Sequence, residues 1–242
     1  MQRYFVDATA IKNDSVTITG PDVHHIRDVM RLSVGAKIGV CPNDGSFHPA
    51  IINSLTKTEV RATIITTTRP AIPPIKITIA QALIRKEHFE LFLEKATELG
   101  VAAVIPTCFD RSIIKIDKDS LDKKLLRYRK IVKEASEQSE RTTMPRIGDF
   151  TDLRKVDFAG YDKVYFAYER CQEAVLLREV IPALPKDGNI LFLIGPEGGI
   201  TEAEATWLKA HGALPVSLGK RILRSETAGL MILSAFLYAG GE

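Results

Sequence analysis

Apolar and polar positions divide the 242-residue chain into two regions of different character. Up to residue 70, short segments rich in β-branched residues are separated by turn signals such as Asn43-Asp44-Gly45, a pattern typical of β-strands. One helix is predicted from Pro21 to about Arg31, because proline suits the first turn of a helix. These elements predict a small β-barrel. Its expected strands are Ser15–Thr19, Lys37–Cys41, Phe47–Asn53 and Thr58–Thr66.

A proline-rich segment, Arg69–Pro74, follows the first region. Proline fixes φ and cannot donate a backbone hydrogen bond, so three prolines here exclude a helix. We interpret this segment as the linker between a domain over residues 1–70 and a second domain over residues 75–242.

In the second region, apolar strands alternate with helices. Nearly continuous apolar strands separated by helices predict an α/β domain with a mostly parallel sheet. The expected strands are Lys76–Ala82, Ala102–Pro106, Lys163–Ala167, Asn189–Ile194 and Pro215–Leu218. The expected helices are Glu87–Leu99, Ser120–Glu140, Gln172–Ile181, Glu202–His211 and Glu226–Ala239.

Two of these helices carry further information. Thr201 and Glu204 have the spacing of a capping box at the start of Glu202–His211. The last helix, beginning near Ser225, contains the run Leu230–Leu233 and is apolar on all sides. Such a helix is expected to be deeply buried or to lie at a subunit interface.

Composition restricts the class of protein only loosely. The chain is 45% hydrophobic and 26% charged, values typical of a globular protein. Its net charge of +3 is compatible with nucleic acid but also with a small metabolite. The first residues lack the apolar segment of a signal peptide, and no apolar run approaches the ~20 residues that cross a bilayer. We therefore expect a cytoplasmic protein without a membrane partner.

No metal site is expected. Cys41, Cys108 and Cys171 are widely spaced and form no CxxC pair, so they are interpreted as free, buried thiols. His24 and His25 lack a third ligand at a suitable spacing and are interpreted as a helix-surface pair.

The sharpest local motif is Gly195-Pro196-Glu197-Gly198-Gly199, between an apolar strand and the capped helix. Ligands of α/β proteins collect at the carboxyl ends of strands, and glycine lets a ligand approach the backbone. A tight turn that merely needs glycine is the alternative. The chain contains neither GxxxxGK[ST] nor GxGxxG, so a P-loop and the usual dinucleotide fingerprint are excluded.

A second motif, Leu218–Gly229, also follows a strand and precedes a helix. Lys220, Arg221 and Arg224 lie beside the expected helix start, which itself favours anionic groups. A solvated loop with Ser225 as N-cap is the alternative interpretation.

Five further segments carry information together with these two loops: Arg3-Tyr4-Phe5, His24–Arg31, Glu94–Val101, Arg111-Ser112 and Glu137–Arg141. Through all of these segments the chain resembles the bacterial 16S rRNA (uracil-N3)-methyltransferase family of the SPOUT superfamily. The resemblance spans almost the whole chain. The family usually has glutamate before the Arg-Ser pair, where this chain has Asp110, which leaves any contact of that acid open.

The resemblance implies a PUA-like RNA-binding barrel at the N-terminus and a SPOUT domain with a trefoil knot at the C-terminus. It implies a homodimer that uses S-adenosylmethionine to methylate N3 of uridine 1498 in 16S rRNA of the 30S ribosomal subunit. It also assigns the cofactor pocket to the two loops, with the Tyr168-Glu169 turn as a weaker candidate. The implied pocket residues are Leu193, Ile194, Gly195, Glu197, Gly198, Gly199, Ile200, Leu218, Gly219, Ile222, Leu223, Arg224, Thr227 and Ala228.

The implied reaction places demands on nearby side chains. The sulfonium is already an activated donor, so alignment of donor and acceptor matters most. N3 of uracil carries a proton, and a cation near the uracil oxygens or a general base would help it leave. Arg224 is our first candidate for stabilising charge on the base. Glu226 could orient that arginine or accept a proton, but an acid in the first helical turn is also favourable structurally.

Contacts to RNA are expected from arginine and lysine. The helix Ser120–Glu140 is also rich in basic residues, a pattern that usually marks a solvated face. The candidates for RNA binding are Arg3, Arg27, Arg31, Arg85, Lys86 and Arg111.

Two alternatives stay open at this point. The chain could be an RNA-binding or ribosome-assembly protein without catalysis, which predicts no cofactor binding. It could also be a nucleotide-dependent enzyme such as a small dehydrogenase, although the missing GxGxxG disfavours this.

Overall fold

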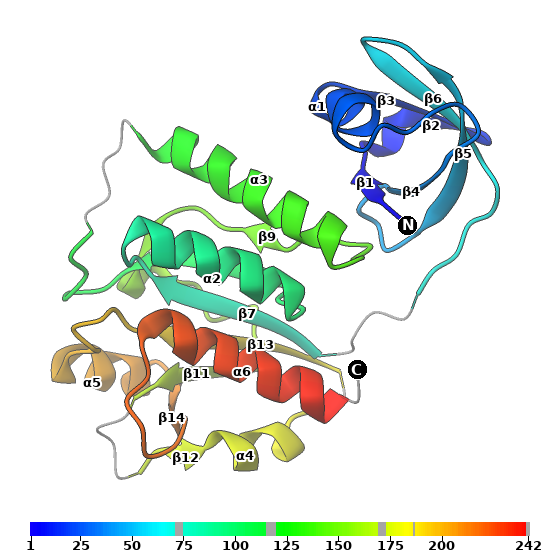
Figure 1. The fold of residues 1–242 in the computed structure, drawn as a ribbon. Coiled ribbons are helices and arrows are strands. Elements are labelled where there is room, and N and C mark those ends of the chain that lie inside the picture. The colour runs from blue at the N-terminus through cyan, green and yellow to red at the C-terminus, as the bar shows by residue number, and fades with distance from the viewer. Residues whose placement is uncertain (71–74, 115–119, 169–172, 186, 241–242) are drawn as a thin grey trace. The chain divides into compact units, whose positions relative to one another are not determined.

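The computed structural model describes residues 1–70, 75–114, 120–168, 173–185 and 187–240. The chain divides into two compact units, of which the first is Met1–Ile72 with Lys133–Met144 and the second is Pro73–Val132 with Pro145–Glu242 (Figure 1). Most of the expected linker, residues 71–74, lies outside the described residues. The sequence pattern does not indicate that residues 133–144 join the first unit.

The first unit contains a curled six-stranded sheet of mixed direction. Its strand order is β1-β4-β5-β6-β3-β2, with β1 parallel to β4 and the other pairs antiparallel. Ile18, Ile38 and Ile52 are buried in its core. The strands are β1 (Arg3–Phe5), β2 (Ile11–Lys12), β3 (Ser15–Thr19), β4 (Lys37–Cys41), β5 (His48–Leu55) and β6 (Glu59–Ile64). The four expected strands are confirmed, whereas β1 and β2 are too short to show a period in the sequence.

The expected helix of this unit forms in two parts. α1 (Pro21–His24) continues into a π-helical turn, His25–Val29, in which Met30 N donates to His25 O over 2.8 Å. The helix therefore ends two residues before the expected Arg31, which adopts a left-handed φ of 51°.

The second unit is built on an all-parallel sheet in its described residues, which confirms the expected α/β class. The order is β10-β8-β7-β13-β11-β14-β12, and β9 pairs with β8. The strands are β7 (Ile75–Ala82), β8 (Ala103–Cys108), β9 (Arg146–Ile147), β10 (Thr151–Asp152), β11 (Lys163–Ala167), β12 (Val175–Leu176), β13 (Gly188–Ile194) and β14 (Leu214–Ser217). The knot implied by the resemblance stays a prediction, because strand pairing alone does not establish threading.

Four expected helices of this region form, and one prediction is wrong. The helices are α2 (Lys86–Glu98), α3 (Leu121–Gln138), α4 (Leu177–Val180), α5 (Glu202–Ala210) and α6 (Ser225–Gly240). The expected helix Gln172–Ile181 is reduced to α4, because Val175 and Leu176 pair with β14 instead. Gln172 lies outside the described residues.

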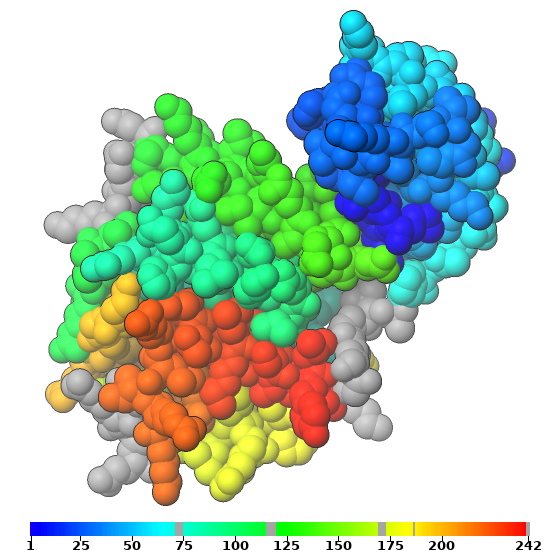
Figure 2. All heavy atoms as spheres, in the orientation of Figure 1, coloured from blue at the N-terminus to red at the C-terminus, as the bar shows by residue number. Residues whose placement is uncertain are grey.

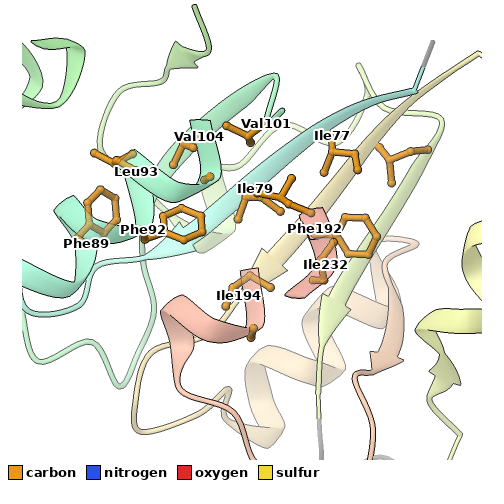
Figure 3. Close-up of a cluster of buried hydrophobic side chains, with 14 of the residues drawn as sticks. Ile77, Ile79, Phe89, Phe92, Leu93, Val101, Val104, Phe192, Ile194 and Ile232 are labelled. Atoms are coloured by element: carbon orange, nitrogen blue, oxygen red, sulfur yellow. The ribbon is translucent and has the colours of Figure 1, made fainter. Parts of the chain in front are cut away.

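Both faces of the parallel sheet are covered, which explains its continuous apolar strands. Phe192 and Ile194 of β13 pack in one cluster with Phe92 of α2 and Ile232 of α6 (Figure 3). Their neighbour Leu193 points to the opposite cluster, to which α5 contributes. Alternate side chains of β13 thus pack into two hydrophobic clusters on opposite faces of the sheet.

The cysteines were expected to be free, buried thiols, and the described ones differ in burial. Cys41 is buried, and this burial raises the pKa of its thiol to about 11. Cys108 is only partly buried. Cys171 lies outside the described residues. The prediction of a buried free thiol is confirmed for Cys41.

Candidate functional site

A cavity of about 430 Å³ lies at the carboxyl ends of β11, β13 and β14 in the second unit. β11 lies between β13 and β14 in the sheet, so the loops that follow these two strands flank the end of β11. The wall of the cavity is formed by both glycine-containing loops together with Ala167 and Tyr168. The two loops singled out in the sequence are therefore brought together around one space.

The glycines of the first loop are required by packing within the protein. A Cβ on Gly195 would lie 2.6 Å from Cγ1 of Ile200, and one on Gly198 would lie 3.1 Å from Cβ of Arg111. Arg111 also donates from Nη1 to Gly198 O over 2.9 Å. Gly199 closes the turn with a φ of 75° and donates to Pro196 O. The glycines thus determine the conformation of the loop, and this loop forms part of the cavity wall.

The second loop is more open. Gly219 has a φ of 114°, and a Cβ added there would meet nothing within 4 Å, so backbone conformation alone favours glycine. Ile222 is 83% exposed although it borders the cavity, which puts it at the mouth. Arg221 and Arg224 are exposed and also border the cavity. The mouth therefore combines an apolar tip with positive charge.

Most residues expected to bind a cofactor border this cavity. Those that do are Ile194, Gly195, Glu197, Gly198, Gly199, Ile200, Leu218, Gly219, Ile222, Leu223, Arg224 and Ala228. Leu193 and Thr227 do not: Leu193 is buried in the core beside α5, and Thr227 is exposed on α6. Leu193 misses the cavity because strand residues alternate between faces, so its neighbour Ile194 borders it instead.

The two expected catalytic residues are placed differently. Arg224 borders the cavity, and its side chain has no hydrogen-bond or ion-pair partner within the described residues. Glu226 is buried outside the cavity wall, and its Oε1 lies 2.9 Å from Nδ1 of His88 on α2. Glu226 thus pairs with another helix instead of orienting Arg224.

Three residues that border the cavity belong to neither of the segments expected to form the pocket: Ala167, Tyr168 and Val216. Tyr168 is the weaker candidate, and Glu169 beside it lies outside the described residues. Ser225 is buried and donates from Oγ to Gly195 O over 2.6 Å. Its partner lies thirty residues away in the chain, so no local pattern could reveal the contact. The residues that the sequence did not indicate at all are Ala167 and Val216.

In the first unit, two of the three expected RNA contacts already have partners. The side chain of Arg3 is only 12% exposed, pairs with Glu140 and stacks on Phe47. Arg27 donates twice to Asp28, and this contact lowers the pKa of that carboxyl to about 2. Arg31 is exposed.

In the second unit, Arg85 and Lys86 are exposed at the start of α2. They follow β7, while Arg111 follows β8, so all three lie at the same sheet edge as the cavity.

The basic helix α3 is partly neutralised. Arg127 donates from Nη2 to Glu90 over 2.6 Å, and Lys133 lies 2.8 Å from Asp22 and 2.7 Å from Glu137. Arg127 and Lys133 therefore have structural partners within the protein.

The described part of the chain contains neither a candidate metal site nor a candidate membrane-spanning helix. No cluster of three or more histidine, cysteine or acidic side chains there is arranged to hold a metal ion. Among the same residues, no helix is both long and apolar enough to span a membrane.

Comparison with known families and proteins agrees with this architecture. Residues 72–237 match an RNA methyltransferase domain, and residues 18–65 match an RNA methyltransferase PUA domain. The ribosomal RNA small subunit methyltransferase E of Bacillus subtilis is 38% identical, over 98% of this chain and 96% of its own length. The protein of the same name from Synechocystis is 31% identical, over 96% and 76%.

Solved structures are similar over the whole chain. A small subunit methyltransferase E from Neisseria gonorrhoeae, bound to S-adenosylmethionine, is 29% identical with a TM-score of 0.84, covering 99% of this chain and 98% of the other. A putative methyltransferase from Legionella pneumophila, in complex with the same cofactor, is 28% identical with a TM-score of 0.88, covering 98% and 97%.

Proposed function

Because this chain belongs to the ribosomal RNA small subunit methyltransferase E family, we propose that it methylates 16S rRNA with S-adenosylmethionine. The observation that carries the proposal is the meeting of both family loops around one cavity at the carboxyl edge of a parallel sheet. We propose N3 of uridine 1498 as the acceptor, and the cytoplasm, where ribosomes are, as the compartment.

The residues around the cavity suit this cofactor. A volume of about 430 Å³ falls within the range of about 300–1,000 Å³ typical of small-molecule pockets. Apolar Ile194, Leu218 and Leu223 can pack against an adenine ring, and the backbone of the glycine-containing turn can reach its polar edge. When bound, S-adenosylmethionine supplies a methyl group on a positively charged sulfur.

The protein's own part in the chemistry centres on Arg224. Methyl transfer to N3 would break the sulfur–methyl bond, form the nitrogen–methyl bond, leave the donor as a neutral thioether and release the N3 proton to water. As that proton leaves, negative charge spreads to the uracil oxygens. The guanidinium of Arg224, which borders the cavity without a protein partner among the described residues, can donate hydrogen bonds to such an oxygen.

Binding of RNA is proposed at the same sheet edge. Arg85, Lys86, Lys220 and Arg221 are exposed there, and an RNA backbone is attracted to such a group of cations. In the first unit, exposed Arg31 is the candidate with no competing partner among the described residues. Arg3 and Arg27 are better explained by their contacts with Glu140 and Asp28.

The function is tested by mass spectrometry of 16S rRNA from a strain lacking this gene and from the same strain carrying the gene again. We expect the N3-methyluridine to disappear in the deletion strain and to return on complementation. Persistence of the mark would refute the assigned substrate. Calorimetric titration with S-adenosylmethionine and with NAD separates the alternatives, because a non-catalytic RNA-binding protein would bind neither.

We also propose that the enzyme is a homodimer through α6. Its outward residues include Met231, 40% exposed, and Tyr238, 88% exposed, with no charged side chain between them. Figure 2 shows this helix, in red, open on the viewed face of the second unit. Such an uncharged helix face is typical of a subunit interface.

Light scattering should give twice the 26.8-kDa mass of the chain. Met231→Glu should shift the protein to monomer, whereas Leu126→Glu at an exposed position of α3 should leave the dimer intact. A wild-type monomer at micromolar concentration would contradict the dimer.

A further inference from the structure

Two buried polar side chains next to the cavity form a chain of hydrogen bonds that the proposed chemistry does not use. Gln81, the penultimate residue of β7, donates from Nε2 to Ser225 Oγ over 2.7 Å. Ser225, the first residue of α6, donates from Oγ to Gly195 O over 2.6 Å. Gln81 is fully buried and Ser225 nearly so. These two hydrogen bonds therefore connect β7, through the start of α6, to the loop after β13.

The direction of each bond follows from the groups involved. A backbone carbonyl only accepts, so the single hydroxyl proton of Ser225 must point to Gly195 O. The amide of Gln81 must then present its nitrogen to Ser225. This leaves Oε1 of Gln81 without a partner among the described residues. A buried acceptor without a donor is unfavourable, so stability alone would favour an apolar residue at position 81.

Close packing of α6 against β7 and α2 brings Ser225 within hydrogen-bond distance of Gln81 and Gly195. A Cβ on Gly229 would lie 2.6 Å from Cε2 of Phe92 and 3.2 Å from Oε1 of Gln81. Only glycine at this position lets the first turns of α6 lie so near β7 and α2. The helix start is thus held against the sheet where the hydroxyl meets Gly195.

We propose that Ser225, oriented by Gln81, is a positioning residue that fixes the two cofactor loops relative to each other. This inference rests on the proposed function. Gly195 and Ser225 both border the cavity, and their bond joins the loop of residues 194–200 to the end of the loop of residues 218–224. Without the bond the loops separate more often, and the apparent affinity falls in proportion to the remaining competent fraction.

The test is calorimetric titration of the full chain with S-adenosylmethionine and with its demethylated product. Ser225→Ala should weaken both affinities about tenfold, as expected for the loss of one well-formed hydrogen bond. Ser225→Thr keeps the hydroxyl and should stay within about twofold of wild type. In turnover assays Ser225→Ala should raise the KM for S-adenosylmethionine while kcat at saturation is retained.

A matched control removes a different buried hydroxyl. Thr97 lies near the end of α2, away from the carboxyl edge of the sheet, and donates to Leu93 O over 2.7 Å. Thr97→Val should lower the melting temperature without changing either affinity. If Ser225→Ala does not fold, Gln81→Leu serves in its place, with an expected weakening of about threefold.

The outcomes separate the two levels of the proposal. Folded Ser225→Ala with wild-type affinity, or Ser225→Thr as weak as the alanine variant, would overturn the positioning role. A wild-type chain that binds neither compound would instead overturn the proposed function.

Discussion

Replacement of Arg224 by alanine is expected to lower kcat for methylation of small-subunit RNA by about 100- to 1,000-fold, the usual effect of removing one donor that stabilises developing charge. The side chain borders the cavity and has no competing partner among the described residues. Single-turnover transfer of a radiolabelled methyl group, at saturating cofactor and RNA, measures the effect directly.

Arg221 offers a matched control on the same loop. It is also exposed and borders the cavity, but its proposed role is only attraction of the RNA backbone. Arg221→Ala should weaken RNA binding by severalfold and leave the single-turnover rate at saturation near that of wild type. Equal losses in kcat for both variants would contradict a catalytic role for Arg224. They would show that Arg224, like Arg221, only contributes positive charge at the mouth of the cavity.

Replacement of Glu204 by alanine is expected to have the largest effect on stability, about 3 kcal/mol. Glu204 is fully buried at the start of α5. Its carboxylate accepts from Thr201 N over 2.8 Å and from Asp110 N over 2.7 Å, and the Thr201 hydroxyl contributes a further bond of 2.9 Å. Alanine would remove the capping box and leave backbone donors of two loops without this acceptor.

The single tryptophan of the chain gives the measurement. Trp207 lies on α5, so its fluorescence reports denaturant unfolding of this region. Glu202→Ala is the control, because this exposed acid occupies the same first turn and contributes about 0.5 kcal/mol through the helix dipole. A loss below 1 kcal/mol for Glu204→Ala would show that water replaces the carboxylate and that the two loops do not depend on it.

Elements with a strong local pattern could be predicted from the sequence. The strands Ser15–Thr19 and Lys163–Ala167 occur with the expected bounds, because apolar β-branched runs between turn signals admit few other structures. The helix expected at Gln172–Ile181 failed because Val175 and Leu176 gain strand partners in β14, some forty residues later. Tertiary pairing overrode local preference there.

The position of the site could be predicted from the two glycine-containing loops, but the reason for the glycines could not. Gly195 and Gly198 make room for Ile200 and Arg111 of the protein itself. The implied chemistry allows Glu226 to orient Arg224, yet Glu226 pairs with His88, 138 residues away. The local pattern marks Ser225 only as a helix cap, and its bond to Gly195 depends on how β13 and α6 meet. Contacts of this kind arise from the fold and leave no local signal.

The central claim is that the loops of residues 194–200 and 218–225 enclose the methyl donor. A crystal structure of the chain grown with saturating S-adenosylmethionine tests it most directly. We predict density for the adenosyl sulfonium between these two loops, with the methyl group facing Arg224. Density at any other place, with the space between the loops filled only by solvent, would contradict the account.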